Sequence, residues 1–144
     1  MAEYKIDEAA WKFMKQRLGY NDEEFEKFRN DPRNEKILRR AALLSNKTVV
    51  FEVVKSHGCN IEHKPGDKFY FSAEGYMLAH KGPKKVCPFI LAPMARLVWI
   101  VQERLYEDLD PQPTFGVAHC EDVGIDCGGW GRVVFETKVI DRQK

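Results

Sequence analysis

The chain of 144 residues is 44% hydrophobic and 12% aromatic, and its 23 basic and 22 acidic residues leave a net charge of +1. This composition supports one packed domain and excludes a disordered chain, and the balanced charge argues against nucleic acid as the main partner. The sequence has no apolar run of about 18 residues and its start is charged, so we expect neither a membrane span nor a secretory signal. We therefore expect a cytoplasmic protein.

The first 46 residues are predicted to form a helical extension. Apolar residues from Ile6 to Leu18 recur at helical spacing, with Asp7 as a cap and Gly19 as a stop. Two further helices are predicted over 21–30 and 34–44. The extension carries no cluster of residues with obvious chemistry, so we expect it to cover the sheet or a partner subunit.

Residues 47–144 are predicted to form a separate α+β domain that contains the cysteines. The predicted strands are 48–54, 68–71 with a hairpin return at 76–78, 114–119 and 132–140, and the predicted helix is 89–106, which Pro93 should kink or delay. The order of elements lacks the βαβ alternation of a parallel sheet. We expect a small, mainly antiparallel sheet packed on one buried helix. Because that helix is apolar on more than one side, we also expect a homodimer or a partner enzyme subunit.

Four cysteines fall in predicted turns or at the ends of elements: Cys59, Cys87, Cys120 and Cys127. Three histidines are their neighbours in sequence: His57, His63 and His119. Cysteines that only fill a core would be expected inside strands and helices. Their distribution favours a functional site, although inert packing stays an alternative.

Three functional interpretations of these residues remain open. In the first, all four cysteines bind zinc or an iron–sulfur cluster. In the second, Cys59, Cys87, Cys120 and His63 hold a zinc ion and Cys127 is spare. In the third, Cys87 is a reactive thiol at a helix N-terminus, with His63 or His57 as general acid–base. Both metal interpretations require the sulfurs of Cys59, Cys87 and Cys120 to lie within about 4 Å of one another.

The segment Gly128-Gly129-Trp130-Gly131 lacks the glycine pattern of nucleotide-binding loops and precedes a strand. We expect a tight bend with Trp130 in the core. Asp67 is expected to be a turn residue that could orient His63, and His80 a solvated loop residue.

The stretch from Val49 to Ile140 carries a set of motifs: Gly58-Cys59, His63-Lys64-Pro65-Gly66-Asp67-Lys68-Phe69, Cys87-Pro88, Cys120-Glu121-Asp122 and Val133-Val134-Phe135-Glu136. Together they resemble a family of small bacterial and archaeal proteins known as a conserved domain of unknown function. The segment Cys127–Arg132 and the helical N-terminus are similar to a longer subgroup. The resemblance implies that Cys59, His63, Cys87 and Cys120 act as a set, and it implies no reaction.

The expected function is a cytoplasmic metal-binding domain that acts as an accessory or small subunit in redox metabolism. The first alternative is an enzyme on a small carbonyl or aromatic substrate, using a metal or a reactive cysteine with a histidine acid–base. The second is a structural interaction domain with inert cysteines. None of these interpretations involves nucleic acid or a membrane.

Overall fold

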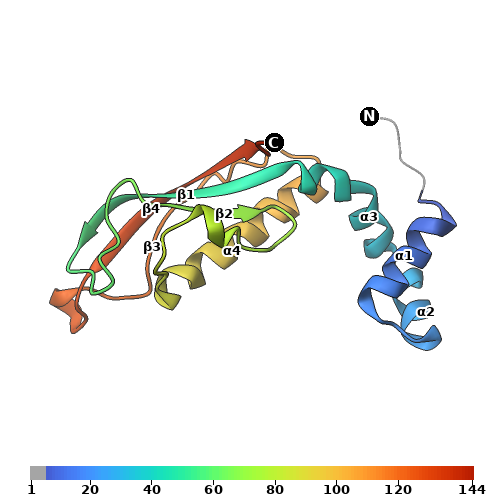
Figure 1. Cartoon of the computed structure of the whole chain (residues 1–144), viewed down its shortest axis with the longest axis horizontal. Coiled ribbons are helices and arrows are strands. Elements are labelled where there is room, and N and C mark those ends of the chain that lie inside the picture. The colour runs from blue at the N-terminus through green and yellow to red at the C-terminus, as the bar shows by residue number, and fades with distance from the viewer. Residues whose placement is uncertain (1–5) are drawn as a thin grey trace. The chain divides into compact units, whose positions relative to one another are not determined.

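A computed structural model describes residues 6–144 and confirms the α+β fold (Figure 1). The helices are α1 (Glu8–Leu18), α2 (Asp22–Asn30), α3 (Pro32–Ser45) and α4 (Pro88–Tyr106), with 3-10 turns η1 (Ala79–Lys81) and η2 (Ile125–Cys127). The strands are β1 (Lys47–His57), β2 (Lys68–Ser72), β3 (Val117–His119) and β4 (Arg132–Asp141). They form one antiparallel sheet in the order β2-β1-β4-β3.

The chain divides into two compact units, one ending at Ala42 and one running from Leu43 to Lys144. The boundary lies within α3 rather than after residue 46. The physical reason is that the last turn of α3 contributes Leu44, which is buried, to the core of the second unit.

The helices of the first unit begin and end at the residues that favour such boundaries. The Asp7 carboxylate accepts the Ala10 N–H, and Gly19 ends α1 in the left-handed conformation. Asn21 and Glu24 form a reciprocal capping box at the start of α2. The third helix starts at Pro32, two residues before its predicted start, because proline suits the first turn of a helix.

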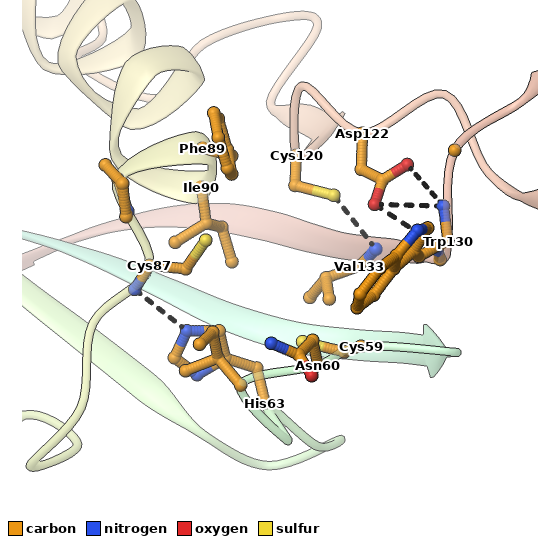
Figure 2. A pocket seen from close by; sticks show the side chains of 14 residues that line it. Cys59, Asn60, His63, Cys87, Phe89, Ile90, Cys120, Asp122, Trp130 and Val133 are labelled. Carbon is orange, nitrogen blue, oxygen red and sulfur yellow. Dashed lines mark hydrogen bonds between the residues drawn. The ribbon is translucent and has the colours of Figure 1, made fainter.

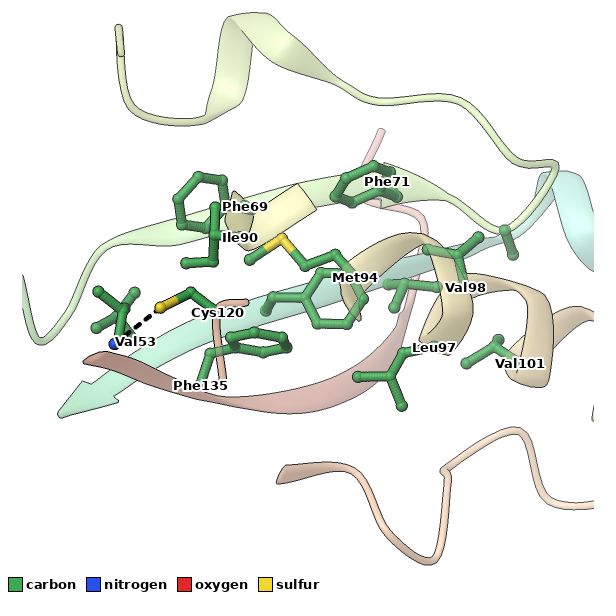
Figure 3. Packing of buried hydrophobic residues seen from close by; sticks show 14 of the residues in the cluster. Val53, Phe69, Phe71, Ile90, Met94, Leu97, Val98, Val101, Cys120 and Phe135 are labelled. Carbon is green, nitrogen blue, oxygen red and sulfur yellow. Dashed lines mark hydrogen bonds between the residues drawn. The ribbon is translucent and has the colours of Figure 1, made fainter. Parts of the chain in front are cut away.

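The core of the second unit lies between one face of the sheet and α4 (Figure 3). Alternate residues of the strands point to this face and are buried, as a pleated strand requires. They include Val49, Phe51, Val53, Phe69, Phe71, Val133 and Phe135. Phe51 makes edge-to-face contacts with Phe71 and Phe135, at centroid distances of 5.5 and 5.4 Å. This packing fixes α4 along the sheet.

Helix α4 begins at Pro88 and continues through Pro93, so the proline does not delay the helix. Its buried side carries Ile90, Met94, Leu97, Val98, Val101 and Leu105. On its other side, Trp99 is 68% exposed and Ile100 45%. The sheet covers one side of this apolar helix, and the partner expected on the other side stays a prediction. No helix in residues 6–144 has the length and apolar character needed to cross a bilayer.

A bulge in β1 determines which side chains reach the cysteines. The β1–β4 register shifts between Val53 and Lys55, so Val54 has no direct partner. Because the shift reverses the alternation, Ser56 lies opposite Val133 on the α4 side, and His57 lies opposite Arg132 on the other side. The end of β1 thus places the Ser56 hydroxyl on the α4 face of the sheet and the His57 imidazole on the opposite face.

Strand β3 begins at Val117, later than predicted. The Gln112 side chain forms the hydrogen bonds to β4 that the first predicted residues of the strand would form. Gln112 Nε2 donates to the Thr137 carbonyl oxygen, and Gln112 Oε1 accepts the Val139 N–H. The edge of β4 is thereby bonded without a regular strand before Val117.

Candidate functional site

A cavity of about 400 Å³ lies where the N-terminus of α4 meets the ends of β1 and β4 (Figure 2). We call it the thiol cavity. It is lined by Cys59, Asn60, Ile61, His63, Cys87, Pro88, Phe89, Ile90, Cys120, Asp122, Gly129, Trp130, Gly131 and Val133. Its volume falls within the usual range for small-molecule sites, and its walls are mainly apolar.

Three of the four cysteines reach this cavity from three separate parts of the fold. Cys59 lies in the turn after β1, Cys87 is the N-cap of α4, and Cys120 directly follows β3. Cys59 and Cys87 are half-buried, whereas Cys120 is 6% exposed. The Sγ atom of Cys120 accepts the Val133 N–H at 3.4 Å, which continues the pairing of β3 with β4. The sequence-based grouping of these three cysteines is therefore seen at one cavity.

His63 is buried in the wall and holds the start of α4. Its Nε2 atom accepts the main-chain N–H of Cys87 at 3.2 Å. Ser56, which the β1 bulge turns to this side, donates its hydroxyl to the His63 carbonyl oxygen at 2.5 Å. The ring also packs edge-to-face against Phe69. Ser56 and Phe69 hold His63 in place, and His63 in turn holds the main chain of Cys87.

Burial lowers the pKa of His63, and the Asp67 carboxylate, 3.9 Å from Nδ1, opposes that shift. The imidazole is consequently neutral near pH 7, which its role as acceptor at Nε2 requires. Because that nitrogen is already bonded to the Cys87 N–H, His63 acts here as a positioning residue. A metal or a substrate proton at Nε2 would have to displace this bond.

The loop after Cys120 is organised by one carboxylate. Asp122 accepts the N–H groups of Gly124, Trp130 and Gly131 at 3.0 to 3.2 Å. These bonds, with that of Gly124 the largest cause, lower the pKa of Asp122. A Cβ atom at Gly129 would stand 2.0 Å from Asp122 Oδ1, so this position requires glycine. The short glycine-rich segment is thus wrapped around Asp122.

The prediction that Trp130 fills the core is wrong. Trp130 is 69% exposed and lines the thiol cavity, because the three bonds to Asp122 hold the loop at the surface. Phe89 also lines the cavity and is 61% exposed. These two aromatic side chains therefore lie at the rim, where they are available to a ligand as well as to solvent.

The loop is held against the end of β1 by contact between backbones. A Cβ atom at Gly58 would stand 2.5 Å from the Trp130 carbonyl oxygen. One at Gly131 would stand 2.3 Å from the His57 carbonyl oxygen. Neither contact could be relieved by moving a side chain, so both positions are restricted to glycine. The resemblance motif begins at Gly58, and this contact gives a physical reason for that glycine.

The two remaining sequence candidates, His57 and Cys127, lie elsewhere. Both are exposed and line a second hollow of about 560 Å³ on the side of the sheet opposite α4. We call it the basic groove; it is lined by Lys55, His57, Val123, Gly124, Ile125, Asp126, Cys127, Gly131, Arg132 and Val134. Since the β1 bulge turns His57 to this side, His57 is not part of the thiol cavity.

The structure also shows where His119 and His80 lie and how the possible metal ligands are arranged. His119 Nδ1 lies 2.6 Å from the Cys120 carbonyl oxygen, and His80 is exposed, as predicted. Within residues 6–144, no group of three or more His, Cys, Asp or Glu side chains is arranged to hold a metal ion. Cys127 stands apart from the other three cysteines, so a four-cysteine site is not formed in this structure.

Comparison of the chain with protein-family models, with curated proteins and with solved structures found no match. The resemblance drawn from the motifs therefore stays a prediction.

Sequence reasoning missed the apolar walls and one polar side chain of the cavity. Ile61, Phe89, Ile90 and Val133 supply much of the lining, and Asn60 adds an amide. A signal was present, since each of these residues is within four positions of a cysteine or of the glycine-rich segment. What the pattern did not show is that the cysteines face an apolar space and not one another.

Proposed function

We propose that the chain binds a small, largely apolar organic molecule in the thiol cavity. The observation that carries the proposal is a cavity of about 400 Å³ with apolar walls and three thiols. About 150 Å³ is enough to hold benzene, so this cavity has room for a larger ring system with substituents. A bare metal ion would leave most of that space empty.

The polar groups of the cavity support an uncharged ligand. The Asp122 carboxylate is already bonded to three main-chain N–H groups, and His63 is neutral with Nε2 occupied. His63 therefore brings no charge to the cavity, and Asp122 uses most of its acceptor sites within the loop. Asn60 supplies an amide that can donate to one carbonyl or hydroxyl oxygen. This arrangement agrees with the small carbonyl or aromatic compound considered from the sequence.

The test is a titration of the full chain with N-phenyl-1-naphthylamine, an uncharged aromatic amine that fluoresces more strongly in apolar surroundings. We expect saturable binding of one molecule per chain. The matched variants are Ile61→Trp, which fills the cavity, and Val123→Trp, which adds the same side chain at the basic groove. Binding should be lost in the first and kept in the second. Non-saturable binding, or equal binding in both folded variants, would overturn the proposal.

Metal binding is the second candidate function, and it is favoured by one observation: thiols from three separate elements line a single cavity. Thiolates suit zinc and iron–sulfur clusters. Since no ready ligand group exists in residues 6–144, binding would have to draw the thiols together. The test is the zinc and iron content of protein purified without oxygen. A stoichiometric metal lost in Cys87→Ser and kept in Cys127→Ser supports it, and metal-free protein contradicts it.

The cytoplasmic location, the role as an accessory subunit in redox metabolism and the homodimer stay predictions. The exposed apolar side chains Trp99 and Ile100 of α4 support a second copy as the partner. Light scattering at micromolar concentration tests the dimer, and a clean monomer mass would contradict it.

A further inference from the structure

We propose that Cys87 is a nucleophile that adds to conjugated carbonyl compounds bound in the thiol cavity. This inference rests on the proposed function, since the cavity must first admit an apolar molecule. It adds the reacting atom, the class of substrate and the bond that forms.

The position of Cys87 is fixed by its main chain, and its side chain is directed to the cavity. Its N–H is bonded to the buried His63, and it is followed by Pro88 at the first position of α4. In Figure 2 the sulfur of Cys87 lies beside Ile90, which also lines the cavity. The thiol therefore has a defined place within an apolar site.

The 19 residues of α4 favour a negative charge at this place. The peptide dipoles of a helix are aligned and leave a partial positive charge at its N-terminus. The N-cap side chain of α4 makes no capping hydrogen bond, so the Cys87 sulfur is not committed to the helix backbone. The Cys87 sulfur can thus meet a bound ligand at the positive end of α4.

The other thiols are less suited to this reaction. Cys120 is buried in the core and its sulfur accepts the Val133 N–H. Cys127 lies on the other side of the sheet in the basic groove. Cys59 lines the cavity and is half-buried, but it lies in a turn without a helix terminus. Cys59 is therefore the one rival, and the experiment must distinguish it from Cys87.

The class of substrate follows from the remaining groups of the cavity. A conjugated carbonyl compound is uncharged and largely apolar, and its β-carbon is electrophilic. It carries one acceptor oxygen, which the Asn60 amide can bind. The apolar side chains Ile61, Ile90 and Val133 provide contact for its carbon skeleton.

The addition balances without an oxidant or a reductant. The Cys87 thiol loses its proton to water, and the thiolate forms a C–S bond with the β-carbon. The π pair of the C=C bond moves through the conjugated system to the carbonyl oxygen, giving an enolate that the Asn60 amide N–H can stabilise. A proton from water then returns to the α-carbon. The product is a saturated carbonyl compound bound to Cys87 by a thioether.

The experiment treats the full chain with cyclohex-2-en-1-one and follows intact mass and peptide maps over time. We expect the mass of one enone to be added at Cys87, at least about tenfold faster than at the exposed Cys127. Cyclohexanone, which lacks the C=C bond, should add nothing. The fast adduct should disappear in Cys87→Ser and persist in Cys127→Ser. The peptide map of the unmodified sequence identifies the reacting residue even if Cys87→Ser does not fold.

The outcomes separate this inference from the function on which it rests. If N-phenyl-1-naphthylamine binds but Cys87 reacts no faster than Cys127, the inference is overturned and the proposed function stands. A fast adduct at Cys59 instead of Cys87 overturns it as well. If the fluorescent amine does not bind, the proposed function fails, and the inference fails with it.

Discussion

The thiol cavity and the basic groove lie on opposite sides of the same strand ends and share Gly131 as a wall, yet their cysteines and histidines have different surroundings. The thiol cavity has buried or half-buried cysteines and a neutral histidine. The basic groove has an exposed cysteine, an exposed histidine and the cations Lys55 and Arg132. The bulge at Val54 causes this difference. Beyond it, the side chains of β1 that point toward α4 are reversed.

The difference shows why neighbouring residues with the same side chain should behave differently. Cys120 and Cys127 are seven positions apart, but one is packed in the core and the other faces solvent. His57 and His63 are six apart, and only His63 is held by hydrogen bonds to the cavity wall. Substitutions in the two environments should therefore have unequal effects.

The largest effect is expected from Gly131→Ala, at the wall that the two hollows share. The added Cβ would overlap the backbone of His57 and Gly58, and relief requires the loop to move away from β1. We expect a loss of about 3 kcal/mol in the free energy of unfolding, measured by denaturant titration. The matched control is Gly82→Ala, whose Cβ would make only ordinary contact, at 3.4 Å from the Lys68 carbonyl oxygen. Equal losses in the two variants would contradict the close approach.

The next effect compares the two cysteines directly. Cys120→Ser puts a hydroxyl into the core and should cost about 1–3 kcal/mol of unfolding free energy. Cys127→Ser replaces an exposed thiol and should stay within about 0.5 kcal/mol of the parent chain. The midpoints of denaturant unfolding measure both. A larger loss in Cys127→Ser than in Cys120→Ser would show that the burial described for the two cysteines is incorrect.

Asp122→Asn should loosen the loop that carries Trp130 without unfolding the domain. The asparagine lacks the charge that holds three N–H groups, and its NH₂ group faces donors. Because the folded-state pKa of Asp122 is lowered, its contribution is present above its ordinary pKa near 4 and is lost as the pH falls below it. Amide hydrogen exchange of 123–131 should accelerate in Asp122→Asn at neutral pH. Unchanged exchange there would contradict the role of the carboxylate.

A smaller effect is expected from the protonation of His63. Its pKa is lowered in the folded state, so the unfolded chain binds the proton more tightly and stability falls as the pH drops through the ordinary histidine pKa near 6.5. The melting temperature should therefore decrease from pH 7.5 to pH 5.5. His63→Gln should remove part of that decrease, whereas His57→Gln should not. An identical pH profile for the parent chain and His63→Gln would argue against a neutral buried imidazole.

The fold was predictable because local patterns and tertiary packing agree along most of this chain. Alternation in β1 and β4 and the cap Asp7 indicated elements that the structure confirms. The boundary within α3 was missed, since it depends on where Leu44 packs and not on its sequence neighbours. Packing of this kind is not visible in periodicity.

The candidate site was predictable only in part. Cys59, Cys87 and Cys120, which were grouped because they lie at the ends of elements, line one cavity, but among residues 6–144 they are not arranged to hold a metal ion. The positions of His57 and Trp130 depended on the Val54 bulge and on the three bonds to Asp122. Both features are set by register and backbone contacts that the sequence pattern does not show.

If the thiol cavity is a ligand site, a bound ligand should protect its cysteines from alkylation. The full chain is saturated with N-phenyl-1-naphthylamine, and alkylation by iodoacetamide is followed at each cysteine by peptide mass. We expect the rate at Cys87 to fall while the rate at Cys127, in the basic groove, stays the same. Equal rates with and without the fluorescent amine at Cys87, or equal protection of Cys87 and Cys127, would contradict it.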